Sequence, residues 1–231
     1  MRRYSVFLLA LLLIVGCKED PPETPDRGRT FLHLLSGAEV DTFDVTFDYF
    51  NADDQVIKDF HWMRNFPISG YADMEAGGEP DEFDNGKLFM TITRQPFANL
   101  PADTVMMPMD LILERDQEAT MCIVDSFGEI TLLKFVDEYS TSPGMANVRF
   151  INLASGQPVA GLTTASGDLN ISNVSFMEAS AWTTVPAGVQ MVELRDTSGT
   201  AVVSQNLWLN SSGVYTFYVS GSSPSLDHFI H

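Results

Sequence analysis

The sequence predicts an all-β protein made of two tandem antiparallel β-sandwich domains that follow a signal peptide and a short tether. Three observations predict this fold class: short runs of β-branched and aromatic residues separated by turn clusters, no helical apolar period sustained over three turns after residue 17, and blocks that recur in one order. We expect residues 30–140 to form a first, divergent sandwich and residues 145–231 a second, with a linker at 141–144.

The first sixteen residues have the features of a secretory signal. Arg2 and Arg3 precede an apolar block over residues 7–16, and this block is shorter than the roughly 20 residues that a membrane-spanning helix needs. A basic start, a short apolar block and a small residue at its end predict a signal peptide over residues 1–16. The polar, proline-bearing residues 17–29 predict a flexible tether.

The end of the apolar block is similar to a known motif. Leu-Ile-Val-Gly before Cys17 resembles the lipobox of bacterial lipoproteins, and this resemblance implies a lipid attached to Cys17 after cleavage before it. Lys18, Glu19 and Asp20 resemble the acidic export signal of Bacteroidota surface lipoproteins. The resemblance implies an outer-membrane protein at the cell surface, with the membrane as a partner through the lipid on Cys17.

The charge of the chain argues against two kinds of ligand. The formal net charge is −18, and residues 17–140 hold 26 acidic and 9 basic residues. Because such a surface repels phosphate groups, we expect no nucleic acid and no anionic lipid surface as a ligand. With Cys17 lipidated, Cys122 has no partner for an intramolecular disulfide.

An internal duplication is visible as four pairs of matching blocks. They are 31–40 with 150–159, 69–77 with 180–188, 110–113 with 206–209, and 119–121 with 215–217. Four matches in the same order predict two copies of one domain.

Each copy shows the patterns of β-strands. Phe43, Val45, Phe47 and Tyr49 alternate with polar residues, as in a half-buried strand. The second copy has runs of branched and aromatic residues over 148–153, 189–194, 202–209 and 214–219, separated by turn clusters at 166–168, 197–199 and 210–213. The Ala-Gly pairs at 76–77 and 187–188 predict turns where a Cβ atom would obstruct the backbone.

The second copy also resembles a catalogued family. The motifs NVRFINL (147–153), SAWTTVPAG (180–188) and GVYTFYV (213–219) are similar to the bacterial family called domain of unknown function 4397. The resemblance covers about residues 145–221 and implies an immunoglobulin-like sandwich on a secreted or surface protein. It supplies no functional residues. The first copy departs from the pattern by a longer segment between its first two blocks and an acidic insertion after Gly77.

The acidic insertion is a weak candidate for a calcium site. Asp81, Asp84 and Asn85 offer oxygen ligands on a predicted tight turn. An EF-hand spacing would place ligands where Phe83 and Ile92 stand, so a solvated hairpin loop is the preferred interpretation. We predict no metal site and no cofactor.

Other candidate residues are aromatic or nucleophilic. Trp62 and Trp208 are candidate contacts for a sugar or a partner side chain, whereas Trp182 aligns with Tyr71 and is expected in the core. Cys122, in an apolar strand, is expected to be buried and inert, with its face of the sheet left open. The four histidines (His33, His61, His228 and His231) show no metal-ligand spacing, and no nucleophile-elbow motif is present.

Two hypotheses on function follow. The first is a non-catalytic cell-envelope lipoprotein whose tandem β-sandwich displays or binds a protein or glycan partner at the outer membrane surface. The alternative is a hydrolase, or an accessory subunit of a surface polysaccharide-degradation system, with acidic residues in an inter-domain cleft. The absence of nucleophile motifs favours the first.

Overall fold

The computed structural model describes residues 30–36, 43–50, 56–66, 71–76, 88–94, 103–106, 117–126, 129–157, 159–221 and 224–231. Within them, no helix is long and apolar enough to span a membrane. The expected signal peptide and tether, Cys17, and the weak calcium candidates Asp81, Asp84 and Asn85 lie outside the described residues.

The strands before residue 140 form what we call the N-terminal half. They are β1 (Thr30–Ser36), β2 (Phe43–Phe50), β3 (Val56–Phe66), β4 (Tyr71–Ala76), β5 (Leu88–Arg94), β6 (Asp103–Met106), β7 (Glu118–Ser126) and β8 (Glu129–Val136). They pair into two sheets, with the strand orders β4-β1-β7-β8 and β3-β2-β5-β6.

The strands after residue 144 form the C-terminal half. They are β9 (Met145–Leu153), β10 (Val159–Thr164), β11 (Asn170–Ser175), β12 (Glu178–Ala179), β13 (Thr183–Pro186), β14 (Gly188–Arg195), β15 (Ala201–Leu209), β16 (Val214–Ser220) and β17 (Ser225–Ile230). Their sheets have the orders β12-β9-β16-β17, with β13 also paired to β9, and β11-β10-β14-β15. The strands predicted over 148–153, 189–194, 202–209 and 214–219 are thus confirmed.

Both halves pair their strands in the same pattern. The first strand of each half pairs in parallel with the last strand but one, β1 with β7 and β9 with β16, and the remaining pairs are antiparallel. The all-β sandwich expectation is confirmed, although one parallel pair in each half departs from a purely antiparallel sheet. The register of the parallel pair differs between the halves. The repeat aligns Phe31 with Phe150 and Met121 with Phe217. Phe150 pairs with Phe217, whereas Met121 pairs with Leu34.

Side chains along β9 point alternately to the two faces of its sheet, and those on both faces are buried. Ala146, Val148 and Phe150 are fully buried and join the core between this sheet and that of β10, β11, β14 and β15. The intervening residues Arg149 and Ile151 are just as buried, although they point to the opposite face. The opposite face of β9 must therefore be covered as well.

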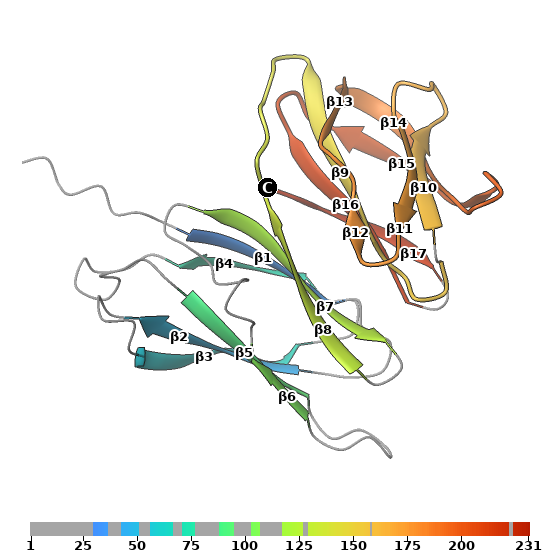
Figure 1. Ribbon diagram of the computed structural model, residues 1–231. Coiled ribbons are helices and arrows are strands. Elements are labelled where there is room, and N and C mark those ends of the chain that lie inside the picture. The colour runs from blue at the N-terminus through green and yellow to red at the C-terminus, as the bar shows by residue number, and fades with distance from the viewer. Residues whose placement is uncertain are drawn as a thin grey trace, which may run out of the picture.

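The N-terminal half covers that face (Figure 1). A second apolar cluster joins Cys122 and Val124 of β7 to Ile151, Leu153, Tyr218 and Phe229, with Leu133 and Phe135 of β8 packed against it. The sheet β4-β1-β7-β8 thus packs on the sheet β12-β9-β16-β17. The face of Cys122, open in the sequence, is the one toward the other half, and burial raises the pKa of its thiol.

Glycines with positive φ occupy two of the predicted turns, and the reason predicted for a glycine at 188 needs a correction. The turn clusters at 166–168 and 197–199 each contain a glycine with positive φ, Gly167 at 81° and Gly199 at 79°. Gly188 also has a positive φ, 123°, but a Cβ atom there would meet nothing within 4 Å. Its backbone conformation, rather than obstruction, is therefore the reason for a glycine at this position.

Candidate functional site

The polar centre of the junction between the halves is Arg149 on β9. Its side chain is 3% exposed, and its Nη1 lies 2.5 Å from Oδ1 of Asp137, whose side chain is fully buried. Nη2 donates to Oγ1 of Thr120, at 2.8 Å, and of Thr216, at 3.0 Å. A buried guanidinium is stable only when it is paired and hydrogen bonded, and partners from both halves supply those bonds.

Thr120 links Arg149 to Asp137, the residue that follows β8. Its hydroxyl donates to Oδ2 of Asp137 at 2.8 Å, so both carboxylate oxygens of Asp137 are engaged. The backbone N–H of Asp137 donates to the carbonyl of Glu118 at 2.9 Å. These bonds hold the Asp137 carboxylate in one orientation.

His231, directly after β17, connects the halves a second time. Its Nδ1 lies 2.8 Å from Oε1 of Glu118 and 3.8 Å from Oδ2 of Asp137, and its Nε2 lies 2.8 Å from Oγ1 of Thr216. The side chain of His231 is fully buried, whereas that of Glu118 is 25% exposed. Both ring nitrogens are therefore hydrogen bonded, one to each half.

Aromatic rings surround these groups. The guanidinium carbon of Arg149 lies 4.5 Å from the centre of the Trp182 ring, a cation–π distance. Tyr139 meets Trp182 edge to face at 5.3 Å and His231 at 5.6 Å between ring centroids. Trp182, expected in the core, is instead partly buried beside this polar cluster.

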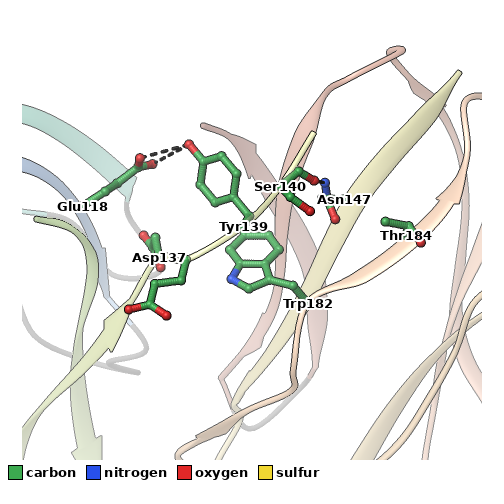
Figure 2. Close-up of a pocket in the computed structure, with 8 residues that line it drawn as sticks. Glu118, Asp137, Tyr139, Ser140, Asn147, Trp182 and Thr184 are labelled. Atoms are coloured by element: carbon green, nitrogen blue, oxygen red, sulfur yellow. Dashed lines mark hydrogen bonds between the residues drawn. The ribbon is translucent and has the colours of Figure 1, made fainter. Parts of the chain in front are cut away.

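Tyr139 and Glu118 lie in a partly exposed part of the cluster. The Tyr139 hydroxyl lies 3.1 Å from Oε1 and 2.9 Å from Oε2 of Glu118 (Figure 2). Burial, and next the hydrogen bond to Glu118, raise the pKa of Tyr139 well above its ordinary value. The phenol therefore keeps its proton and donates a hydrogen bond to the carboxylate at physiological pH.

An open pocket of about 760 Å³ lies over this cluster. Figure 2 shows its wall, with Tyr139 between Glu118 and Trp182. The lining residues are acidic, aromatic or small and polar: Glu118, Asp137, Glu138, Tyr139, Ser140, Asn147, Trp182 and Thr184. Beside the pocket, Glu118, Asp137 and His231 each offer one possible ligand atom, and these three atoms lie within 4.8 Å of one another.

The candidate aromatic residues lie away from this junction. Trp208 on β15 is 67% exposed and pairs across the sheet with Val189 on β14, which is 66% exposed. Met191 and Val202, at 40% and 42%, are also exposed on these two strands. We call Val189, Met191, Val202 and Trp208 the β14–β15 patch. Trp62 lies in β3, and its side chain is outside the described residues.

Sequence reasoning missed the junction cluster. The histidines looked scattered along the chain, yet the fold places His231 beside Glu118, 113 positions away. One signal was present: Arg149 is the single charged residue in the apolar run over 148–153. A second signal was the alignment of Thr120 with Thr216 in the repeat. A threonine at the same place in both matched strands marks a polar position in an otherwise apolar block.

Comparisons with known proteins add little to this geometry. No protein-family model and no curated protein matches the chain. The resemblance of residues 145–221 to domain of unknown function 4397 therefore stays a prediction.

Several solved structures show a distant likeness. One is the tip fimbrial protein Mfa3 from Porphyromonas gingivalis with C-terminal truncation, at 5% identity and a TM-score of 0.24, covering 88% of this chain and 98% of that chain. Another is a fimbrial assembly protein from Parabacteroides distasonis, at 12% identity and a TM-score of 0.23, with 89% of this chain and 95% of that chain covered. A third is the Bacillus anthracis TIE protein, at 8% identity and a TM-score of 0.23. The match covers 86% of this chain but only 34% of that chain. TM-scores this low carry no argument about function.

Proposed function

We propose that this chain is a non-catalytic lipoprotein of the outer membrane, anchored at the cell surface by a lipid on Cys17. Its two β-sandwich domains, 30–140 and 145–231, are joined into one body and present a binding surface to a protein or glycan partner. The lipid anchor is supported by the lipobox-like residues before Cys17. The two-domain division is supported by the repeated strand order of the two halves.

The observation that carries the binding role is the β14–β15 patch. Its two most exposed members, Trp208 and Val189, are direct cross-strand neighbours, and their strands turn the opposite face toward their own core. An exposed indole offers a flat apolar surface with one hydrogen-bond donor, which suits both a sugar ring and a partner side chain. Exposed apolar side chains that are direct neighbours, as Trp208 and Val189 are, form the kind of surface that mediates binding.

The hydrolase alternative receives less support. Glycosidases hold their two carboxyl groups about 5–5.5 Å or about 6.5–9.5 Å apart, with one of them free to reach a water or a sugar carbon. At the junction, the Asp137 carboxylate has no exposed surface and both of its oxygens are hydrogen bonded to Arg149 and Thr120. The Glu118 carboxylate accepts hydrogen bonds from Tyr139 and contacts His231. We infer that these acids stabilise the junction.

A glycan array and a surface-protein pull-down with the full chain purified in detergent test this proposal. Binding that is lost in Trp208→Ala and kept in Val136→Ala, a matched change at a 42% exposed apolar residue on β8, would support the patch as the contact surface. Equal binding by both variants would contradict it. Mass spectrometry of the mature N-terminus tests the lipid on Cys17 separately.

A further inference from the structure

We propose that Glu118, Asp137 and His231 form a binding site for a zinc-type divalent cation that locks the two halves together. The three donors come from three separate places in the chain: the start of β7, the residue after β8, and the residue after β17. Two of them belong to the N-terminal half and one to the C-terminal half. An ion bound by all three would bridge the junction.

The donor chemistry selects the class of ion. One imidazole nitrogen and two carboxylate oxygens suit Zn²⁺ and its neighbours among the transition metals, whereas Ca²⁺ and Mg²⁺ prefer oxygen alone. The three ligand atoms lie within 4.8 Å of one another. Ligand atoms on a tetrahedral zinc ion are about 3.3–3.5 Å apart, given bond lengths of about 2.0–2.2 Å. The present separations from Nδ1 of His231, 2.8 Å to Glu118 and 3.8 Å to Asp137, lie on either side of that value.

The surrounding hydrogen bonds are those that orient metal ligands. Nε2 of His231 lies 2.8 Å from Oγ1 of Thr216, which can accept a hydrogen bond from Nε2–H when Nδ1 binds a metal. Arg149 holds Oδ1 of Asp137, and Thr120 donates to Oδ2, the oxygen nearer to His231. A carboxylate oxygen has a second lone pair, which an ion can use while the bond from Thr120 is kept. Tyr139 holds the Glu118 carboxylate. Each ligand therefore has a partner that fixes its orientation.

The ion has a route to the site. Glu118, whose side chain is 25% exposed, lines the open pocket of about 760 Å³, so an ion and its remaining water ligands can enter from solvent on that side. The fully buried side chains of Asp137 and His231 provide the inner ligands. Binding would replace the His231–Glu118 hydrogen bond by two metal bonds. Since the ion binds the folded junction alone, it should stabilise the docked form of the two halves.

Zinc titration of the full chain, purified in detergent and stripped with a chelator, tests this site. We expect one Zn²⁺ per chain by calorimetry and a rise in Tm of roughly 5–10 °C at a hundredfold excess over Kd. His231→Gln should weaken the binding more than about tenfold, because removing a ligand costs more than removing one of its outer partners. His228→Gln is the matched control, since His228 lies on β17, three residues before His231, and stacks on Phe217 at 5.4 Å instead of joining the cluster.

A second variant keeps the test valid if His231→Gln fails to fold. Glu118→Gln preserves the size of the side chain and its hydrogen bond to Tyr139 but removes the anionic ligand. Loaded with Co²⁺, the unaltered chain should show the visible absorption of a protein-bound nitrogen–oxygen site, and Glu118→Gln should lose it. Zinc affinity that is the same in the unaltered chain and both variants would mean adventitious binding to the acidic surface and would overturn the proposal. The absence of binding would overturn it too.

Discussion

Thr120 on β7 and Thr216 on β16 accept hydrogen bonds from the same nitrogen, Nη2 of Arg149, at 2.8 and 3.0 Å. The two threonines occupy matching positions in the repeated blocks 119–121 and 215–217. Matching strands of the two halves therefore face each other across the junction, with one guanidinium shared between them. Cys122 and Tyr218, the next matched pair on this face, lie together in the apolar cluster beside it.

Breaking the buried ion pair should strongly destabilise the protein. Arg149→Met leaves the fully buried Asp137 carboxylate without its cation, and we expect a loss of about 3–5 kcal/mol in the free energy of unfolding. Urea denaturation of the full chain measures it. Arg195→Met is the control, because its pair with Glu193 is partly exposed and should contribute about 1 kcal/mol or less. Equal losses in the two variants would contradict a structural role for Arg149.

The two threonines should act as a coupled pair. Thr120→Val and Thr216→Val each remove an acceptor while keeping the shape of the side chain, and Arg149 Nη2 then depends on the remaining one. Because the two sites share one donor, their effects should not add, with an interaction energy of about 0.5–3 kcal/mol in a double-mutant cycle. Strict additivity would indicate that the threonines do not share Arg149 in solution.

Cys122 should be chemically inert in the folded chain. Its thiol is fully buried between the halves, and burial raises its pKa well above the ordinary value, so little of the reactive thiolate exists at pH 8. In Cys17→Ser, a thiol reagent should therefore react with Cys122 only after denaturation. Rapid labelling of the native chain would show that the junction opens readily.

Stability should decline at alkaline pH through Tyr218. Burial raises the pKa of Tyr218 to about 12, above the value of about 10 in an unfolded chain. The folded state thus holds the phenolic proton more tightly, and its contribution to stability is complete below pH 10 and is lost as the pH rises from about 10 to about 12. Tyr218→Phe should flatten this part of the stability–pH curve. A curve of unchanged slope would contradict the burial of Tyr218 at the junction.

Residues 145–231 alone should keep their β structure but expose one face. Their own core contains Val148, Phe150 and Phe217, so the circular dichroism spectrum of the fragment should be that of a β protein. Ile151 and Phe229 would lose their cover from the N-terminal half, and the fragment should bind an apolar dye that the full chain does not. A random-coil spectrum would count against two domains.

The sequence predicted the local features well, since they depend on short-range patterns. Alternation in 43–49 predicted β2, where Phe43 and Val45 are fully buried. The junction could not be predicted in this way, because β9 and β16 are buried on both faces and so show no polar alternation. His231 and Glu118 meet through the packing of two sheets, which no spacing along the chain encodes.

If the junction around Arg149 joins the two halves into one body, the distance between them should be fixed. Spin labels at Glu129 on β8 and Ser204 on β15, both exposed, would be placed in a chain with Cys17 and Cys122 replaced by serine and alanine. Pulsed electron–electron double resonance should give one narrow distribution of the distance between the two labels, and this distribution should broaden in Arg149→Met. A broad distribution in the chain that retains Arg149 would show that the halves move independently and are not one body.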